Sequence, residues 1–248
     1  DAAEAMLADA KCPCLTFSCD KDVADLTATN LGLHADGVEF VAAVKGEMAR
    51  VKLGIPGKFS VENALAALGM VLQAGMPLAE AAKALATANG VKGRVEVVPT
   101  DTDYTVLIDY AHTPDGVENV LRAVRGFAKG RVVALFGCGG DRDRTKRTKM
   151  GKIAVDLADF GVVTSDNPRM EDPQAIIDDI LEGMKGTKTP MQVIVDRTEA
   201  IHWAMAHAKK DDVIVLMGKG HETYQEVNGV KHHMDEREIV ADYFTKKK

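Results

Sequence analysis

The 248-residue chain has few aromatic side chains, few cysteines and no long apolar run. Aromatic residues make up 5% of it, with a single tryptophan, which leaves little for stacking against bases. No apolar run approaches the roughly 20 residues that a membrane helix needs. The formal net charge is −6, and an acidic balance disfavours a nucleic-acid backbone as the main partner. We therefore expect neither a nucleic acid nor a membrane as partner.

A signal-peptide pattern and an initiator methionine are also missing, because the chain begins Asp1-Ala2-Ala3-Glu4. We expect a fragment or a processed chain in the cytoplasm, where its four cysteines would be free thiols. A partial metal site is the alternative reading of three cysteines and one histidine: Cys12, Cys14, Cys19 and His34. The Cys-x-Cys spacing fits zinc patterns poorly, so we predict no metal site.

Apolar residues at 46% and charged residues at 27% are typical of a globular chain that can bury a core. The first 55 or so residues read as β-rich, with strands at 37–42 and 49–53. A helix is expected to follow from Ser60, with Ser60 itself as the N-cap. A second helix should open at Pro77.

From about residue 91 the pattern becomes strand, polar or glycine-rich loop, and helix, repeated. The strands are expected at 105–110, 131–136, 160–164, 191–195 and 213–217. Thr113-Pro114 and Asp172-Pro173 should cap two of the helices, and another helix should begin near Lys149. This alternation predicts an α/β fold, with a doubly wound, mostly parallel sheet covered by helices.

Four unusually polar segments follow these strands, at 109–115, 137–144, 165–169 and 218–222. In an open α/β sheet, ligands bind outside the carboxyl ends of the strands. One such loop would be ordinary turn chemistry, but four at the same edge of the sheet predict a binding cleft.

The charges in these loops suggest the ligand. Residues 141–152 hold six cationic side chains against two acidic ones, which favours an anionic ligand or, alternatively, a solvated basic helix face. The glycines of 137–140 would let a ligand approach the backbone closely. Arg169 offers a planar fork for a carboxylate, whereas Asp166 and Asn167 could merely form a turn. For 218–222, the alternative is a turn in which Glu222 starts a helix.

The chain does not match three familiar motifs, the P-loop, the dinucleotide-binding fingerprint and the nucleophile elbow of hydrolases. Gly57-Lys58-Phe59 is not the end of a P-loop, because Lys52 stands where a glycine is needed and Phe59 replaces the Ser or Thr. Gly137-x-Gly139 lacks the third glycine of a dinucleotide fingerprint, and no Gly-x-Ser-x-Gly elbow is present. The residues alone therefore predict an α/β domain that binds a small anionic or zwitterionic ligand.

The order and spacing of the motifs resemble those of the Mur ligase family, the ATP-dependent amino-acid-adding enzymes of peptidoglycan synthesis. The matching segments are Gly57-Lys58-Phe59-Ser60-Val61-Glu62-Asn63-Ala64, Gly93-Arg94, Asp109-Tyr110-Ala111-His112-Thr113-Pro114-Asp115, Gly137-Cys138-Gly139-Gly140-Asp141-Arg142-Asp143, Asp166-Asn167-Pro168-Arg169 and Gly218-Lys219-Gly220-His221-Glu222. Arg169 after Asp-Asn-Pro resembles the type that adds meso-diaminopimelate, since the lysine-adding type usually differs there.

The resemblance implies a Rossmann-like C-terminal domain at 92–248, preceded at 1–91 by the last part of a central α/β ATPase domain. The residues that would bind meso-diaminopimelate are Arg142, Asp166, Asn167, Pro168, Arg169, Gly218 and Glu222. Those that would lie near ATP are Asn63, Arg94, Asp109 and His112. The full-length enzyme would use ATP and Mg²⁺ to join meso-diaminopimelate to UDP-N-acetylmuramoyl-L-alanyl-D-glutamate, in cell-wall synthesis and thereby in cell shape and division.

The family's P-loop, carbamoylated lysine and Mg²⁺ ligands have no counterpart in the 248 residues. We therefore assign no catalytic residue and expect the chain alone to be inactive, with the UDP-linked substrate bound by missing domains. Three alternatives stay open: a ligase that adds L-lysine or another amino acid, a folylpolyglutamate synthetase relative, and a non-catalytic binding protein.

Overall fold

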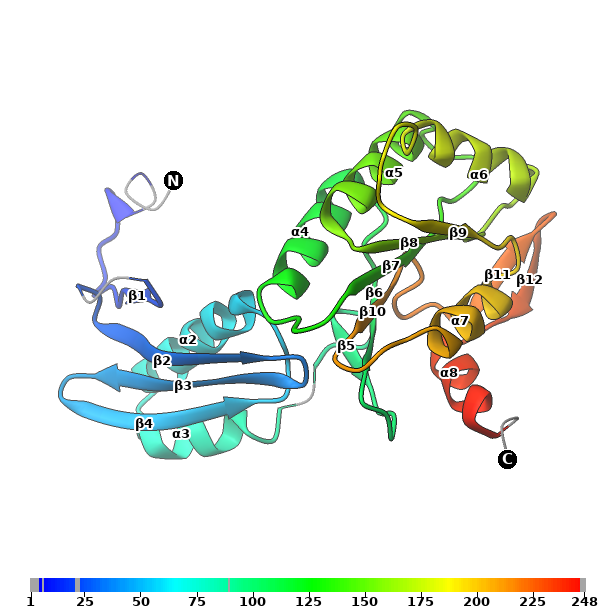
Figure 1. The fold of residues 1–248 in the computed structure, drawn as a ribbon. Coiled ribbons are helices and arrows are strands. Elements are labelled where there is room, and N and C mark those ends of the chain that lie inside the picture. The colour runs from blue at the N-terminus through cyan, green and yellow to red at the C-terminus, as the bar shows by residue number, and fades with distance from the viewer. Residues whose placement is uncertain (1–4, 6, 21–22, 89, 246–248) are drawn as a thin grey trace. The chain divides into compact units, whose positions relative to one another are not determined.

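The computed structural model describes residues 5, 7–20, 23–88 and 90–245 (Figure 1). The chain separates into two compact units. The smaller unit comprises most of the chain up to Ala88, and the larger unit comprises the chain from residue 90 onward together with the short segments 34–36 and 55–57. Within the described ranges, no helix combines the length and the apolar character that crossing a membrane requires.

The smaller unit is a four-stranded sheet in the order β1-β2-β3-β4 with two helices. Its elements are β1 (Phe17–Ser18), β2 (Leu26–His34), β3 (Gly37–Val44), β4 (Glu47–Leu53), α2 (Lys58–Gln73) and α3 (Leu78–Leu85). Strands β3 and β4 form an antiparallel hairpin in which Val38 pairs with Leu53. Every second residue of β3 is buried, as the alternating sequence predicts.

Helix α2 begins two residues earlier than its sequence suggests, at Lys58. Ser60 is therefore not the N-cap; it lies inside the first turn and is buried, at 2% exposure. The chain enters the helix through Gly57, whose φ of +95° suits glycine. The helix therefore starts directly after this glycine turn and not at a capping hydroxyl.

The larger unit is built on a six-stranded sheet in the order β5-β6-β10-β7-β8-β9. Its strands are β5 (Glu96–Val98), β6 (Thr105–Asp109), β7 (Val132–Phe136), β8 (Phe160–Val163), β9 (Met191–Val193) and β10 (Val213–Met217). All neighbouring pairs are parallel except β5 with β6. Strand β10 lies between β6 and β7, so the last strand of this sheet brings its following loop to the middle of the sheet.

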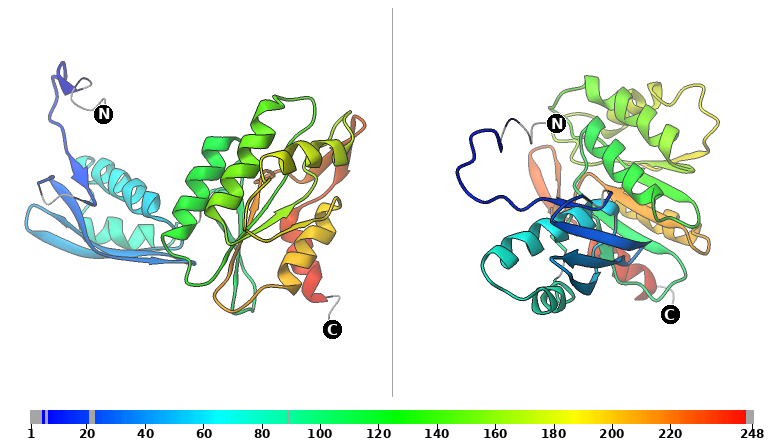
Figure 2. Two further views of the ribbon diagram at one scale, coloured as in Figure 1. Left: turned by 45° about the horizontal axis from the view of Figure 1, so that its top comes forward. Right: turned by 90° about the vertical axis from the view of Figure 1, so that its left-hand side faces the viewer.

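Helices cover both faces of this sheet: α4, α5 and α6 on one face, and α7 and α8 on the other (Figures 1 and 2). Their bounds are α4 (Pro114–Arg125), α5 (Thr145–Leu157), α6 (Pro173–Glu182), α7 (Arg197–Ala206) and α8 (Glu236–Thr245). The predicted caps of α4 and α6 are present, because Thr113 and Asp172 accept backbone N–H groups of the first turns. The predicted doubly wound, mostly parallel α/β fold is confirmed.

Three features differ from the expectation. Helix α5 begins at Thr145 rather than near Lys149, because the carboxylate of Asp143 accepts the Thr145 N–H at 2.9 Å and starts the helix inside the polar run. The alternative reading in which Glu222 starts a helix is wrong, because the hairpin β11 (Tyr224–Val227) and β12 (Val230–His233) follows it. Neither this hairpin nor α8 is among the elements expected from the sequence, although Ile239, Val240 and Tyr243 of α8 stand at helical spacing.

Candidate functional site

The four polar loops meet at the carboxyl ends of β6, β7, β8 and β10, as predicted. They enclose a cavity of about 420 Å³. Its lining residues are Tyr110, His112, Thr113, Gly139, Arg142, Asp143, Lys146, Asp166, Asn167, Arg169, Gly218 and Glu222. Each of the four loops contributes to this set, so the cleft expected from the sequence is present.

The charges around the cavity are balanced rather than basic. Three cationic side chains line it, Arg142, Lys146 and Arg169. Three carboxylates line it as well: Asp143, Asp166 and Glu222. A cavity with both signs of charge complements a zwitterion better than a simple anion.

The basic run of 141–152 contributes less to the cavity than its sequence suggests. Arg147 is fully buried and binds Glu171 at 2.7 Å and Asp179 at 2.9 Å. Arg144 also binds Asp179, at 3.0 Å. Lys152 pairs with Asp156 one turn away on the exposed face of α5. The alternative of a solvated basic face therefore holds for Arg144 and Lys152, whereas Arg147 is buried in ion pairs that neither reading expects.

Arg169 is held in a fixed orientation beside the cavity. Its Nη1 donates to the carbonyl oxygen of Gly140 at 2.8 Å, and its Nε lies 3.4 Å from Glu226 Oε2. The backbone of Arg169 has a φ of +52°, which non-glycine residues seldom adopt. Two hydrogen bonds to the β11–β12 hairpin keep it there, from Arg169 N to Glu226 O and from Asn228 N to Arg169 O. The guanidinium has further N–H groups that can bind a carboxylate.

A buried lysine organises the acidic side of the cavity. Lys219 is 0% exposed and donates to Asn167 Oδ1 at 2.7 Å and to Glu222 Oε2 at 3.0 Å. The same Glu222 oxygen accepts the Asn167 Nδ2 group at 2.9 Å. Lys219 thus neutralises charge beneath the cavity, while Asp166 and Glu222 line it.

Two glycines let the loops around the cavity pack closely against one another. A Cβ at Gly140 would lie 1.9 Å from the carbonyl oxygen of Pro168. A Cβ at Gly218, whose φ is +114°, would lie 2.4 Å from Asp166 Oδ2. Gly140 therefore serves a contact between neighbouring loops, whereas Gly139 lines the cavity, so close approach of a ligand to this segment stays a prediction.

Asp109 lies behind the cavity at the end of β6. Its carboxylate accepts the backbone N–H of Val95 at 2.8 Å and of Ala111 at 2.7 Å. Burial raises the pKa of Asp109, and these two hydrogen bonds oppose that shift. Because both oxygens are engaged by the main chain, Asp109 fixes the segment around Val95. Arg94 of that segment lies over the ring of Tyr110, 5.3 Å from its centroid.

Of the other predicted site residues, one lines the cavity and two do not. His112 lines the cavity, and its ring contacts Tyr110 with 4.7 Å between centroids. Pro168 contributes its carbonyl to the packing against Gly140 and does not line the cavity. Asn63 is exposed on α2 of the smaller unit.

Among the described residues, the cysteines of the alternative zinc reading do not form a group of metal ligands with His34. Cys12 and Cys14 are exposed free thiols. Across residues 5, 7–20, 23–88 and 90–245, the one group of three side chains close enough to share a metal ion is Cys19, Asp20 and Glu62. Lys58 already binds Asp20 at 2.6 Å, which lowers the charge available to a cation.

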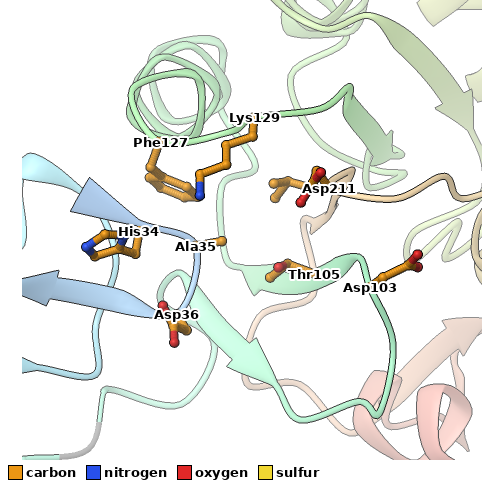
Figure 3. Close-up of a pocket in the computed structure, with 9 residues that line it drawn as sticks. His34, Ala35, Asp36, Asp103, Thr105, Phe127, Lys129 and Asp211 are labelled. Atoms are coloured by element: carbon orange, nitrogen blue, oxygen red, sulfur yellow. The ribbon is translucent and has the colours of Figure 1, made fainter. Parts of the chain in front are cut away.

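Figure 3 shows a second hollow in the larger unit, of about 200 Å³. Thr105 and Val213, which line it, are the first residues of β6 and β10. It therefore lies at the amino ends of the strands, away from the four loops. Lys129 and Asp211 border it, and His34 belongs to its rim.

Comparison with known proteins identifies the family. Residues 93–220 match the Mur ligase, glutamate ligase domain, and residues 1–71 match the Mur ligase middle domain. The chain belongs to the Mur ligase family. A 2,6-diaminopimelate ligase of Clostridium acetobutylicum, named UDP-N-acetylmuramoyl-L-alanyl-D-glutamate--2,6-diaminopimelate ligase 1, is 50% identical over 89% of the chain and 46% of its own length.

Solved Mur ligases share the fold. A structure of a UDP-N-acetylmuramoyl-L-alanyl-D-glutamate--2,6-diaminopimelate ligase superposes with a TM-score of 0.79 at 36% identity, over 99% of this chain and 52% of that one. The ADP complex of a MurF ligase from Thermotoga maritima has a TM-score of 0.61 at 17% identity, over 94% of this chain and 48% of that one, and shows likeness of fold alone. The chain spans about half the length of the curated relatives it matches.

Several residues of this Mur ligase site are not singled out by sequence reasoning. Tyr110 and Lys146 line the cavity, and Lys219 lies beneath it. Tyr110 and Lys219 stand inside motifs that carry the family resemblance, and this position could have marked them as site residues. Glu226, which contacts Arg169, lies in the hairpin that follows the last motif and has no such signal.

Proposed function

We propose that the chain is the amino-acid-binding part of an ATP-dependent ligase that adds meso-diaminopimelate to UDP-N-acetylmuramoyl-L-alanyl-D-glutamate in peptidoglycan synthesis. The observation that carries the proposal is the balanced cavity, with Arg142 and Arg169 facing the same space as Asp166 and Glu222. The names of relatives at 44–50% identity agree with it. A substrate carrying UDP favours a cytoplasmic enzyme.

The chemistry of meso-diaminopimelate matches the cavity because each end of the molecule is an amino acid, with one carboxylate and one ammonium group. Arg142 and Arg169 would bind the distal carboxylate through charge-assisted hydrogen bonds. Asp166 and Glu222 would accept the distal ammonium group, and Asn167 would hold Glu222 in place. Gly218 would let Asp166 approach, and Pro168 would set the loop against Gly140. L-lysine has no distal carboxylate, so it would leave the remaining N–H groups of Arg142 and Arg169 in the cavity without an anionic ligand.

In this proposal the two family matches correspond to two domains of the chain. Residues 1–91 are the last part of the central domain, and residues 92–248 are the C-terminal domain; the division into compact units near residue 89 supports this. ATP, with Mg²⁺, supplies the energy for amide formation in the whole enzyme. Arg94 and His112 beside Tyr110 fit a site next to that nucleotide, whereas Asp109 acts through the main chain it holds. The role of Asn63 near ATP stays a prediction from the family resemblance.

A nuclear magnetic resonance titration of the ¹⁵N-labelled chain with meso-diaminopimelate tests the proposal, since it detects binding with a Kd as weak as about 1 mM. We expect the amide signals of 166–169 and 218–222 to shift on addition of the amino acid. Arg142→Ala should weaken binding about tenfold or more, the loss of one charge-assisted interaction. The matched control is Arg144→Ala, because Arg144 binds Asp179 outside the cavity and should leave the Kd unchanged.

Absence of any shift at saturating amino acid, or equal weakening by both substitutions, would contradict the proposed function. Equal shifts with L-lysine would instead favour the ligase that accepts another amino acid. The whole chain alone should form no amide bond from ATP and the two substrates, because its sequence has no P-loop.

A further inference from the structure

A fully buried ion pair lies next to the cavity without lining it. Arg197 is the first residue of α7 and Glu236 the first residue of α8. Both side chains are 0% exposed, and Arg197 Nε donates to Glu236 Oε1 at 2.8 Å. Neither residue belongs to the motifs that carry the family resemblance, and Glu236 follows the last residue of the family match at 220.

The other donors of Arg197 reach the roots of two site loops. Nη2 donates to the carbonyl oxygen of Met217 at 2.8 Å, and Nη1 donates to that of Ser165 at 3.3 Å. Met217 directly precedes Gly218, and Ser165 directly precedes Asp166. A guanidinium is planar and rigid, so one side chain fixes the distance between the two main-chain segments.

Glu236 keeps the guanidinium in this position. A buried arginine without a counter-charge is strongly unfavourable, and Glu236 is the acidic partner that Arg197 has in the described part of the chain. Its second oxygen, Oε2, has no hydrogen-bond partner among the described residues, so one oxygen alone holds the pair together. Burial raises the pKa of Glu236, and the neighbouring Arg197 opposes that shift.

We propose that Arg197 and Glu236 are positioning residues of the amino-acid cavity, which set the spacing between the loop bearing Asp166 and Arg169 and the loop bearing Gly218 and Glu222. The inference rests on the proposed function for the identity of the ligand, and on the contacts alone for the spacing. The two loops together supply Asp166, Arg169 and Glu222 to one ligand end, so a change in their spacing weakens binding even where each side chain is intact.

A second arginine provides a matched control. Arg131 binds the buried Asp212, and its Nη2 donates to the carbonyl oxygen of His207 at 3.0 Å. It thus makes the same kind of contacts as Arg197, an acidic partner and a main-chain carbonyl. Arg131 directly precedes β7 and contacts the start of β10, so its contacts lie at the sheet edge opposite the cavity.

Hydrogen exchange measured by mass spectrometry on the whole chain tests the proposal without any ligand. In Arg197→Met, amides of 165–169 and 217–222 should exchange about tenfold or more faster, as expected when two buried hydrogen bonds are lost locally. In Arg131→Met these two segments should exchange as in the parent chain, while the melting temperature falls. Unchanged exchange of both loops in Arg197→Met, or an equal increase in both variants, would overturn the proposal.

Glu236→Gln keeps the size of the side chain and one acceptor oxygen, and it decides the matter if Arg197→Met does not fold. We expect a smaller increase in exchange at the same two loops, and no increase there would overturn the proposal. Binding of meso-diaminopimelate should weaken about tenfold in Arg197→Met, in proportion to the loosened loops. If the parent chain does not bind this amino acid, the proposed function fails, whereas the exchange data still decide whether the pair positions the loops.

Discussion

Replacing Lys219 by methionine should destabilise the larger unit severely, although the change keeps most of the apolar length of the side chain. Lys219 is 0% exposed, and its ammonium group lies 2.7 Å from Asn167 Oδ1 and 3.0 Å from Glu222 Oε2. Breaking a buried ion pair from one side costs about 3–5 kcal/mol, because the remaining charge stays buried. The Glu222 side chain keeps 15% exposure, so water can reach it and the lower end, about 3 kcal/mol, is expected.

Urea denaturation followed by tryptophan fluorescence measures this loss in the relevant unit. Trp203 is the single tryptophan of the chain and lies in α7 of the larger unit. The matched control is Lys152→Met, which removes an exposed pair with Asp156 and should cost no more than about 0.5 kcal/mol.

The double variant Lys219→Met/Glu222→Gln should regain about 1 kcal/mol or more relative to the sum of the two single changes, because the unpaired carboxylate is then absent. A loss below about 1 kcal/mol in Lys219→Met would refute the reasoning, since it would mean that the ammonium group stabilises nothing in the folded state.

Two further predictions concern titratable groups. Hydrogen bonds from Arg147 lower the pKa of Glu171 from its ordinary 4.5 to about 2, so its contribution to stability is present above pH 4.5 and is lost as the pH falls toward 2; Glu171→Gln should flatten the decline of the urea midpoint in that window, and an unchanged decline would contradict the assignment. Burial raises the pKa of Cys138 to about 12, so iodoacetamide at about pH 8 should modify Cys12 and Cys14 and leave Cys138 intact until the chain is unfolded. Equal modification rates in the folded chain would show that Cys138 is accessible.

The sequence correctly predicts the strands, helix caps and loops that form the cavity, because each of them has a strong local sequence pattern. The apolar runs of β6, β7, β8 and β10 and the caps Thr113 and Asp172 specify the elements, and the parallel sheet then brings their polar loops to one edge. Periodicity and capping act within a few residues, which is why these predictions succeed.

Features that depend on contacts between distant residues are less visible. The basic run 141–152 predicts an anion site, yet Arg147 forms an ion pair with Glu171, 24 residues away, and does not face the cavity. The hairpin that holds Arg169 in a positive φ has no apolar alternation, because its strands are half-buried or exposed. Likewise, Arg197 and Glu236 are separated by 39 residues, and no local sequence pattern predicts that their side chains form an ion pair.

The measurement that tests the central claim most directly is the ratio of affinities for meso-diaminopimelate and L-lysine, by calorimetry, in the parent chain and in Arg169→Ala. The account predicts that the parent chain binds meso-diaminopimelate about 10- to 100-fold more tightly, and that this ratio falls about tenfold in Arg169→Ala, in which Arg142 is still present. Equal affinities in the parent chain, or a ratio that survives the substitution, would contradict it.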